Sequence, residues 1–318
     1  MTLHEPARAW PGVSLLTDEV STCMALDMGG RELWRWFVQG HDQVEHFELL
    51  DGGRIVAVSV DQGVTLLDAD SKVAWQVDCA AHHDVHATTR GTFLVPVHTE
   101  HDHAGRRVRF DAVVELDAGG EEVGRWRARD HLDALRALHG AHALDEPAAT
   151  ESDTVYDYHH LNTVLELDHP ALGGEARLLC LRNVSLLVAV DPRTGVPGWS
   201  FGPGELDFPH DPSLTPEGRL LVFDNGFHRG WSRLVEIDPA TREVVWSWAA
   251  DPPESFFSEV RGACQRLPNG NTLVTESERG RAFELDPDGN VVWRLEGPRR
   301  IYRVRRVAEE RLAFARGR

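Results

Sequence analysis

A short motif recurs six times along the chain and limits the folds that the chain can adopt. In each copy an Asp ends an apolar strand, a turn follows, and the next strand carries a Trp seven to nine residues after the Asp. The Asp residues are Asp27, Asp68, Asp117, Asp191, Asp238 and Asp286, and the matching Trp residues are Trp34, Trp75, Trp126, Trp199, Trp246 and Trp293. Asp favours tight turns, and a large indole gives a strand a face to bury. The motif therefore predicts six β-hairpins.

A second hairpin precedes the first in several of these units. The segments "FELLDGGRIVAVSV", "PSLTPEGRLLVF" and "CQRLPNGNTLVT" each predict a strand, a Gly turn and another strand. Four short strands in roughly 40 to 50 residues is the period of a β-propeller blade. We therefore expect an all-β fold, a six-bladed β-propeller with four-stranded blades, as a single domain over residues 1–318. Strands in 301–315 should pair with the N-terminal hairpin in 13–36 and close the ring, which removes free sheet edges.

One segment between the third and fourth blades has helical rather than strand-like spacing. Leu132, Leu135 and Leu138 recur at helical intervals, with Asp130 as the expected N-cap. The sequence thus predicts a short helical insertion at about 128–150. Because it follows an outer strand and precedes an inner one, we expect it on the face where the inner strands begin, as a candidate lid.

The charge balance limits the partners that the protein can bind. Acidic residues outnumber Lys and Arg by 51 to 33, for a formal net charge of -18. Nucleic acid and anionic membrane surfaces would repel most of such a molecule, so we expect neither as a partner. The N-terminal sequence has no basic segment followed by an apolar run, which favours a cytoplasmic protein made without export. The four Cys residues form no CxxC pair and are expected to be buried thiols.

The predicted inner strands place histidines at one repeat position. His83 and His210 each lie eight residues before a turn Gly, and His160 has the same spacing to its own expected turn. Inner strands of a propeller surround the axis, so these three side chains should converge in the central channel, with His46 and His86 nearby. A single His at a strand start can be a hydrogen-bonded framework residue. A structural role would not favour imidazole at one position in three blades, so we interpret the three as a functional cluster.

Loops on the same predicted face add polar groups. Arg182 lies between apolar strands, where a charge needs a counterpart, and we expect it to bind an anion. Asn225 and His228 follow the second strand of the fifth blade. The predicted substrate contacts are His46, Asn162, Asn225, His228 and Arg261. The histidine-rich segment 98–103, "HTEHDH", is rich in charge and is expected to form a solvated rim.

Several of these segments resemble the arylsulfate sulfotransferase family. The resemblance covers about residues 40–295 and includes "HHDVHA", "HHLNTV", "HDPSLTPEGRLLVFDNG" and "LPNGNTLV". The resemblance implies a six-bladed propeller that moves a sulfuryl group from a phenolic sulfate to another phenol, without a nucleotide donor or other cofactor. It also implies a small aromatic substrate. The sequence departs from the family pattern at "TTRG" in the third blade, where "LPNG" is expected, and at the helical insertion.

The same resemblance assigns roles to the candidate catalytic residues. His210 corresponds to the histidine that becomes sulfated, and His160 and Arg182 correspond to the side chains that hold the sulfuryl oxygens. His83 or His86 corresponds to a further active-site histidine. A neutral imidazole can attack sulfur and later leave, which divides one transfer into two steps.

Two other classes of function stay open at this stage. Imidazoles that meet on an axis can hold a transition metal such as Fe, Cu, Ni or Zn, which would make the protein a metalloenzyme. The ligands would then be His46, His83, His86, His160 and His210. Asp84 and Asp211, each directly after a candidate ligand, could orient the rings. A non-catalytic scaffold that binds partners through a propeller face is the third possibility.

Overall fold

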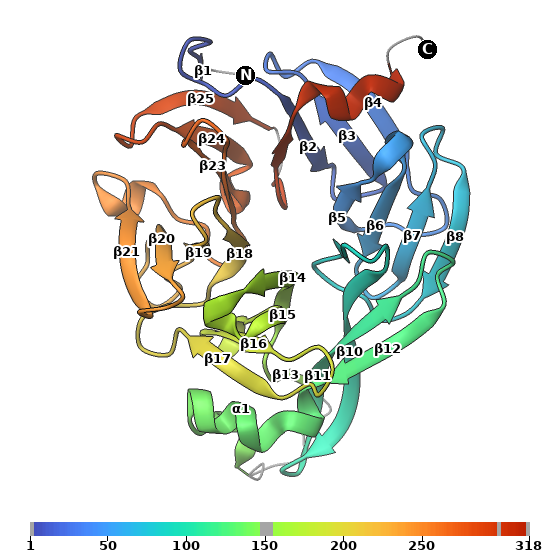
Figure 1. Cartoon of the computed structure of the whole chain (residues 1–318), viewed down its shortest axis with the longest axis vertical. Helices are drawn as coiled ribbons and strands as arrows, with labels where there is room; N and C mark the ends of the chain where they lie inside the picture. Colours follow the sequence, from blue (N-terminus) through green and yellow to red (C-terminus); the bar gives the residue numbers. More distant parts are fainter. Residues whose placement is uncertain (1–2, 147–154, 298–299, 316–318) are drawn as a thin grey trace.

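The computed structural model describes residues 3–146, 155–297 and 300–315 and forms a ring of six antiparallel sheets (Figure 1). The predicted six-bladed propeller with four-stranded blades is therefore confirmed. The second blade contains β5 (Val44–Leu49), β6 (Ile55–Ser59), β7 (Gly63–Leu67) and β8 (Val73–Asp78). The third contains β9 (His86–Ala87), β10 (Phe93–His103), β11 (Arg106–Leu116) and β12 (Glu122–Arg127), with β13 (Tyr156–Asp157) added parallel to β11.

The fourth and fifth blades follow in the same order. The fourth contains β14 (Leu161–His169), β15 (Gly174–Leu181), β16 (Leu186–Val190) and β17 (Pro197–Phe201). The fifth contains β18 (His210–Leu214), β19 (Leu220–Asp224), β20 (Arg233–Asp238) and β21 (Glu243–Trp248). In both blades the first strand lies nearest the axis and the fourth lies at the outer edge (Figure 1).

Both ends of the chain take part in closing the ring. The sixth blade contains β22 (Ala263–Arg266), β23 (Thr272–Glu276), β24 (Arg281–Leu285) and β25 (Val291–Glu296). The first contains β26 (Arg305–Val307), β2 (Val13–Thr17), β3 (Thr22–Leu26) and β4 (Glu32–Phe37). The innermost strand of this blade is thus C-terminal, as predicted. The sequence did not predict β1 (Leu3–His4), which pairs with the outer strand β25 and joins the ends a second time.

The repeated Trp residues connect each blade to the next. Five of the six donate an indole N–H hydrogen bond to a backbone carbonyl in the outer turn of the following blade, at 2.8–3.1 Å. The pairs are Trp34 with Ala69, Trp75 with Ala118, Trp126 with Gly195, Trp199 with Pro239 and Trp293 with Met28. The last pair joins the sixth blade to the first. Trp246 is not among these five, and the Arg266 guanidinium, from the following blade, stacks over its ring at 4.9 Å.

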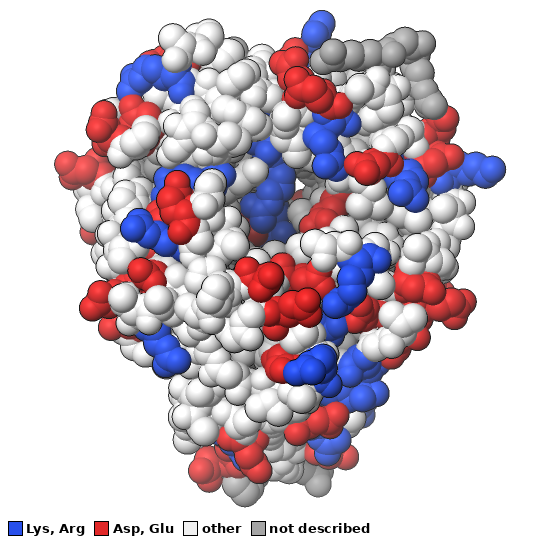
Figure 2. All heavy atoms as spheres, in the orientation of Figure 1, with Lys and Arg blue, Asp and Glu red and all other residues white. Residues whose placement is uncertain are grey.

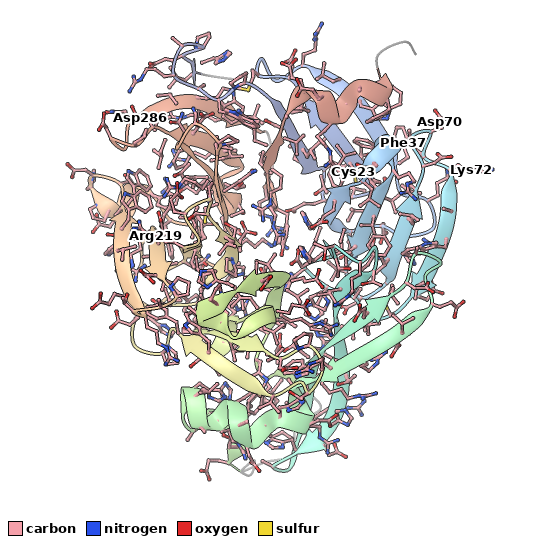
Figure 3. The ribbon with its side chains drawn as sticks, in the orientation of Figure 1. Cys23, Phe37, Asp70, Lys72, Arg219 and Asp286 are labelled. Carbon is pink, nitrogen blue, oxygen red and sulfur yellow. The ribbon has the colours of Figure 1, made fainter. Side chains whose placement is uncertain are left out.

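The repeated Asp residues hold the turns that receive these bonds. In each turn the Asp side chain accepts hydrogen bonds from two backbone N–H groups within the next four residues, for example Asp70 and Lys72 on Asp68 at 2.9 Å. Asp286 does the same and also pairs with Arg8 of the N-terminal segment. Figure 3 shows Asp70 and Lys72 at the outer edge of the ring, close to Phe37 of the preceding blade. The Asp of one blade therefore shapes the turn whose carbonyl accepts the indole N–H of the preceding blade.

The predicted helical insertion exists, but it is not a lid. A 3-10 turn (Ala128–His131) leads into α1 (Leu132–His139), which lies at the outer rim of the ring, beyond β17 (Figure 1). Leu135 is fully buried in a core shared with Trp126 and residues of the fourth blade. The need to bury this apolar stripe directs the helix to the blade boundary. Asp130 is part of the 3-10 turn and not the N-cap, and residues 147–150 of the predicted insertion lie outside the described residues.

Within the described part of the chain, no helix is both long and apolar enough to cross a membrane.

Replacing Trp75 with Phe tests the bond between blades. Trp75→Phe keeps an aromatic ring but leaves the Ala118 carbonyl without its donor, and we expect a loss of about 1 kcal/mol in the free energy of unfolding beyond the packing loss. Trp246→Phe is the matched control, because Trp246 is also half-buried and its indole N–H has no partner among the described residues. Urea unfolding of both variants measures the difference. Equal losses would contradict a stabilising role for the Trp75 bond.

Candidate functional site

The three histidines in register lie where the inner strands begin, around the axis. His210 is the first residue of β18, His160 directly precedes β14, and His83 lies three residues before β9. His83 and His160 both have a positive φ, 62° and 57°, which is uncommon for residues other than Gly and is often found at functional sites. The space-filling view shows a hollow at the centre of the ring with Arg or Lys and acidic side chains inside it (Figure 2).

His83 and His160 are in direct contact, and each is backed by a carboxylate. Their Nε2 atoms are 2.8 Å apart. Nδ1 of His83 is 3.0 Å from Glu45 Oε2, and Nδ1 of His160 is 2.5 Å from Asp157 Oδ2. A carboxylate accepts, so each Nδ1 carries a proton. The short Nε2 to Nε2 distance then requires one further proton between the rings.

The groups around the pair determine how that proton is shared. Burial alone would raise the pKa of the Glu45 carboxyl, but the charge and hydrogen bonds of His83 and the Arg261 guanidinium lower it to about 2. An ionised Glu45 stabilises an imidazolium at His83. Burial, with the nearby His83 and Arg182 charges, lowers the pKa of His160 well below its usual value. The two Nε2 atoms therefore share one proton, and a positive charge on the His160 ring is disfavoured.

Asn225 fixes the tautomer of His210. The Asn225 Nδ2 group donates to the backbone carbonyls of Ser258 at 2.7 Å and Arg261 at 2.8 Å, which directs Oδ1 toward His210. His210 Nδ1 lies 2.8 Å from this oxygen and 3.2 Å from the Phe208 carbonyl. Both partners are acceptors, so Nδ1 carries the proton and Nε2 keeps its lone pair.

Burial and a nearby positive charge keep the His210 ring neutral. Burial lowers its pKa well below the usual value, and the positive charge of Arg182 acts in the same direction. The Arg182 guanidinium stacks over the Phe208 ring at 5.4 Å and donates to Asn183 Oδ1 at 2.9 and 3.1 Å. An unprotonated nitrogen thus lies close to a fixed guanidinium, an arrangement suited to a nucleophile that attacks an anionic group.

Below the histidines, a network of buried ion pairs crosses the axis. Arg303 contacts Asp84 Oδ1 at 2.8 Å and Asp211 Oδ1 at 3.3 Å, and Arg305 also pairs with Asp211. Asp84 accepts the backbone N–H of Val164 at 3.0 Å, and Asp211 that of Cys264 at 2.9 Å, each in the following blade. The two carboxylates were expected to orient the rings of the candidate ligands, but arginines and neighbouring strands take their oxygens, and only Asp84 lies near one of these rings, 3.7 Å from His46.

The other predicted contacts occupy several environments. Asn162 is fully buried and donates to the Pro209 carbonyl at 2.8 Å, which joins two blades. His46 is buried 3.7 Å from Asp84, and His86 lies further along its strand, with Nδ1 3.5 Å from Glu48. His228 is exposed and pairs with Asp207. Arg261 lies over the Tyr302 ring and contacts Glu19 and Glu45. Of this group, Asn225 and Arg261 touch the axial histidines or their carboxylates.

Three residues of the site were missed in the sequence. Glu45 lies eight residues before Gly53, so the spacing that found His83 would have found it if carboxylates had been included in the search. Asp157 belongs to the irregular β13 segment, where no repeat position identifies it. Tyr302, whose ring stacks on His83 at 6.0 Å, comes from the segment that closes the ring. The sequence predicts that this segment closes the ring, but not that Tyr302 packs on His83.

A second histidine cluster lies beside the first. His82 and His98 stack with ring centroids 3.8 Å apart, and His82 Nε2 is 3.3 Å from Asp111 Oδ1. Burial lowers the pKa of His82 to about 3 and that of His98 to about 2, so both rings are neutral. The prediction of a solvated rim is wrong for His98, because β10 and β11 form a long hairpin whose inner part is buried.

The structure does not bring the five predicted metal ligands together. Within the described ranges, the group of three His, Cys, Asp or Glu ligands whose donor atoms lie within 4.8 Å of one another is His82, His98 and Asp111. His83 and His160 direct their Nε2 atoms at each other, and His46 and His86 face Asp84 and Glu48. The alternative of a metal held by the axial histidines therefore has no geometric support.

A family model describes most of this chain. The model for arylsulfotransferase (ASST) matches residues 46–298, a span that contains His83, His160, Arg182 and His210. The chain belongs to the arylsulfotransferase family. The resemblance in the sequence is thereby confirmed at the level of the family. No curated protein matches the chain significantly.

Solved structures resemble this arylsulfotransferase-family chain in fold. A protein of unknown function from Bacteroides caccae has a TM-score of 0.64 at 14% identity, with 94% of this chain and 100% of that chain covered. A streptogramin B lyase has a TM-score of 0.56 at 11% identity, covering 92% and 81%. The WD40 β-propeller domain of Doa1 has a TM-score of 0.51 at 11% identity, covering 90% and 75%. At these identities the likeness supports the propeller fold alone.

The ion pair of Glu45 and His83 predicts a pH-dependent stability. A carboxyl whose pKa is lowered stabilises the folded state above its ordinary value of 4.5, and this contribution is lost as pH falls toward about 2. We expect Glu45→Gln to be less stable than the wild type near neutral pH, with a difference that shrinks as the solution is acidified through this range. Glu48→Gln removes a carboxylate from the same strand without breaking the contact to His83 and is the control. Urea unfolding across pH measures both, and a difference for Glu45→Gln that is independent of pH would contradict the ion pair.

Proposed function

We propose that this protein transfers a sulfuryl group from an aryl sulfate to a phenolic acceptor through a sulfated His210. The observation that carries the proposal is the Nδ1–H tautomer of His210, which Asn225 holds and which leaves Nε2 as a neutral nucleophile beside Arg182. Membership of the arylsulfotransferase family supports the same class of reaction.

In the first step the Nε2 lone pair attacks sulfur, and the bond from sulfur to the aryl oxygen breaks. The departing phenolate takes the proton that His83 shares with His160, which avoids release of a free anion into a buried site. The sulfuryl oxygens keep their negative charge and lie against Arg182. Preorganised donors of this kind are worth about 2.7–4 kcal/mol each in a transition state.

In the second step the acceptor phenol gives its proton to the same histidine pair and attacks the sulfur of the N-sulfonated His210. The bond from Nε2 to sulfur breaks, and the ring returns to its neutral form. Nδ1 stays protonated throughout, bound to Asn225, so the sulfonated ring is an imidazolium and leaves readily. The proton of the acceptor thus replaces the one that the histidine pair gave up in the first step.

An aromatic shelf beside Arg182 fits a small aryl substrate. Phe208 and Phe227 stack with ring centroids 4.7 Å apart, and Phe227 is 37% exposed. The guanidinium of Arg182 covers Phe208. Offset stacking on such rings favours a flat apolar group that carries an anion at one end.

Mass spectrometry of a single-turnover reaction tests the proposal. Wild-type protein incubated with a chromogenic aryl sulfate and no acceptor should release one equivalent of phenol and gain one sulfuryl group on the peptide that contains His210. His210→Ala should lose both the burst and the adduct, with transfer reduced by at least about 10³-fold.

His4→Ala, on the outermost strand of the sixth blade, is the control and should behave as the wild type. A stable adduct on another residue, or a burst that persists in His210→Ala, would contradict the assignment. An absence of phenol release from a broad panel of aryl sulfates would overturn the proposed reaction itself.

A further inference from the structure

The second cluster, made of His82, His98 and Asp111, contains buried polar atoms without partners. His82 and Asp111 are each 1% exposed. Both ring nitrogens of His82, Nδ1 of His98 and both carboxylate oxygens of Asp111 lack a hydrogen-bond partner among the described residues. The His160 and Leu161 amides lie close enough to affect the Asp111 carboxyl, but neither makes a hydrogen bond of normal geometry. Buried polar atoms are nearly always paired, so this group calls for an additional ligand.

Backbone hydrogen bonds hold these three residues side by side, His98 on β10, Asp111 on β11 and His82 next to an isolated β-bridge to β10. The His82 N–H donates to the Pro96 carbonyl at 3.1 Å, and the His98 N–H donates to the Ala80 carbonyl at 2.9 Å, on either side of the bridge between Ala81 and Val97. His98 and Asp111 are directly opposite in the ladder of β10 and β11. Side chains directly opposite each other on paired strands lie close together because of the strand pairing. Sheet pairing thus fixes His98 and Asp111, and backbone hydrogen bonds to β10 hold His82 beside them.

We propose that His82, His98 and Asp111 form a site for one divalent transition-metal ion of the zinc type. Two imidazoles and one carboxylate, with donor atoms within 4.8 Å of one another, are a ligand set that such ions prefer. Both rings are neutral, so their lone pairs are available. The rings are parallel to within 5°, and one must rotate about its Cβ–Cγ bond for both to face one ion.

The surroundings supply negative charge and a route to solvent. Asp61 Oδ1 lies 3.6 Å from His98 Nε2, on the side of the ring opposite Nδ1, and its side chain is 55% exposed. A carboxylate at this position orients a ligating histidine. Asp157 Oδ1 also lacks a partner among the described residues, and the Asp157 charge acts on His82, His98 and Asp111. The negative charges of these carboxylates offset the positive charge of the nearby Arg109 guanidinium.

The site would position the catalytic pair without taking part in the transfer. His82 directly precedes His83, and the two rings are in edge contact with centroids 5.1 Å apart. An ion on His82 would fix the start of the His83 segment, whose residues lie outside any strand before β9. This role differs from the predicted alternative, in which the axial histidines themselves bind the metal.

Cobalt binding to protein without a histidine tag tests the site. After treatment with a chelator, the wild-type protein should bind one equivalent of Co²⁺ with visible d–d absorption, and Zn²⁺ should displace it. His98→Ala and Asp111→Asn should each lose this absorption and weaken binding by at least about 10-fold, as removal of a ligand or of its partner does.

His101→Ala, on the same hairpin, and His210→Ala should both bind Co²⁺ as the wild type does. Circular dichroism establishes that each variant is folded. His98→Ala, at the partly exposed end of the cluster, serves if Asp111→Asn does not fold. No uptake by folded wild-type protein, or uptake that His98→Ala leaves unchanged, overturns the site. Since metal uptake is measured without an aryl sulfate, its failure leaves the proposed sulfuryl transfer standing, and the reverse also holds.

Discussion

The buried pairing of two arginines with two aspartates at the axis is the interaction on which the site depends. Arg303 and Arg305 come from the C-terminal segment, whereas Asp84 and Asp211 belong to the third and fifth blades. Each Asp directly follows a site histidine and also accepts a backbone N–H of the next blade. Because removal of one partner would leave a buried charge unpaired, the network strongly favours the closed ring. It thereby fixes the backbone from which His83 and His210 extend.

The outer part of the ring is held by hydrogen bonds between blades instead of ion pairs. The Asp of each repeat shapes a turn, and the carbonyl presented by that turn accepts the indole N–H of the preceding blade in five of six cases. Inner charge pairs and outer hydrogen bonds together leave each blade little freedom to rotate. A site assembled from separate blades needs this rigidity, since misplacement of a catalytic group by about 1 Å can cost 10²-fold in rate.

The Asp and Trp repeat predicts the six-bladed propeller from the sequence alone. Spacing between Asp and Trp indicated the blades, and the eight-residue interval to the inner turns identified His83 and His210. What sequence reasoning missed depends on contacts between segments that are distant along the chain. His98 was interpreted as part of a charged rim, because a run of charges does not reveal that half of an eleven-residue strand is buried. Asp84 and Asp211 were assigned to the histidines, because nothing in the sequence shows that Arg303 and Arg305 reach them first.

The positions of the protons on the three axial histidines follow from their hydrogen-bond partners, and the proposed sulfuryl transfer depends on them. Long-range ¹H–¹⁵N correlation spectra of the ¹⁵N-histidine-labelled protein report the tautomer of each ring. We predict a neutral His210 protonated on Nδ1 at neutral pH, and one proton shared between the Nε2 atoms of His83 and His160. An imidazolium at His210, or a neutral ring protonated on Nε2, would contradict the account, because neither form has a lone pair available at Nε2.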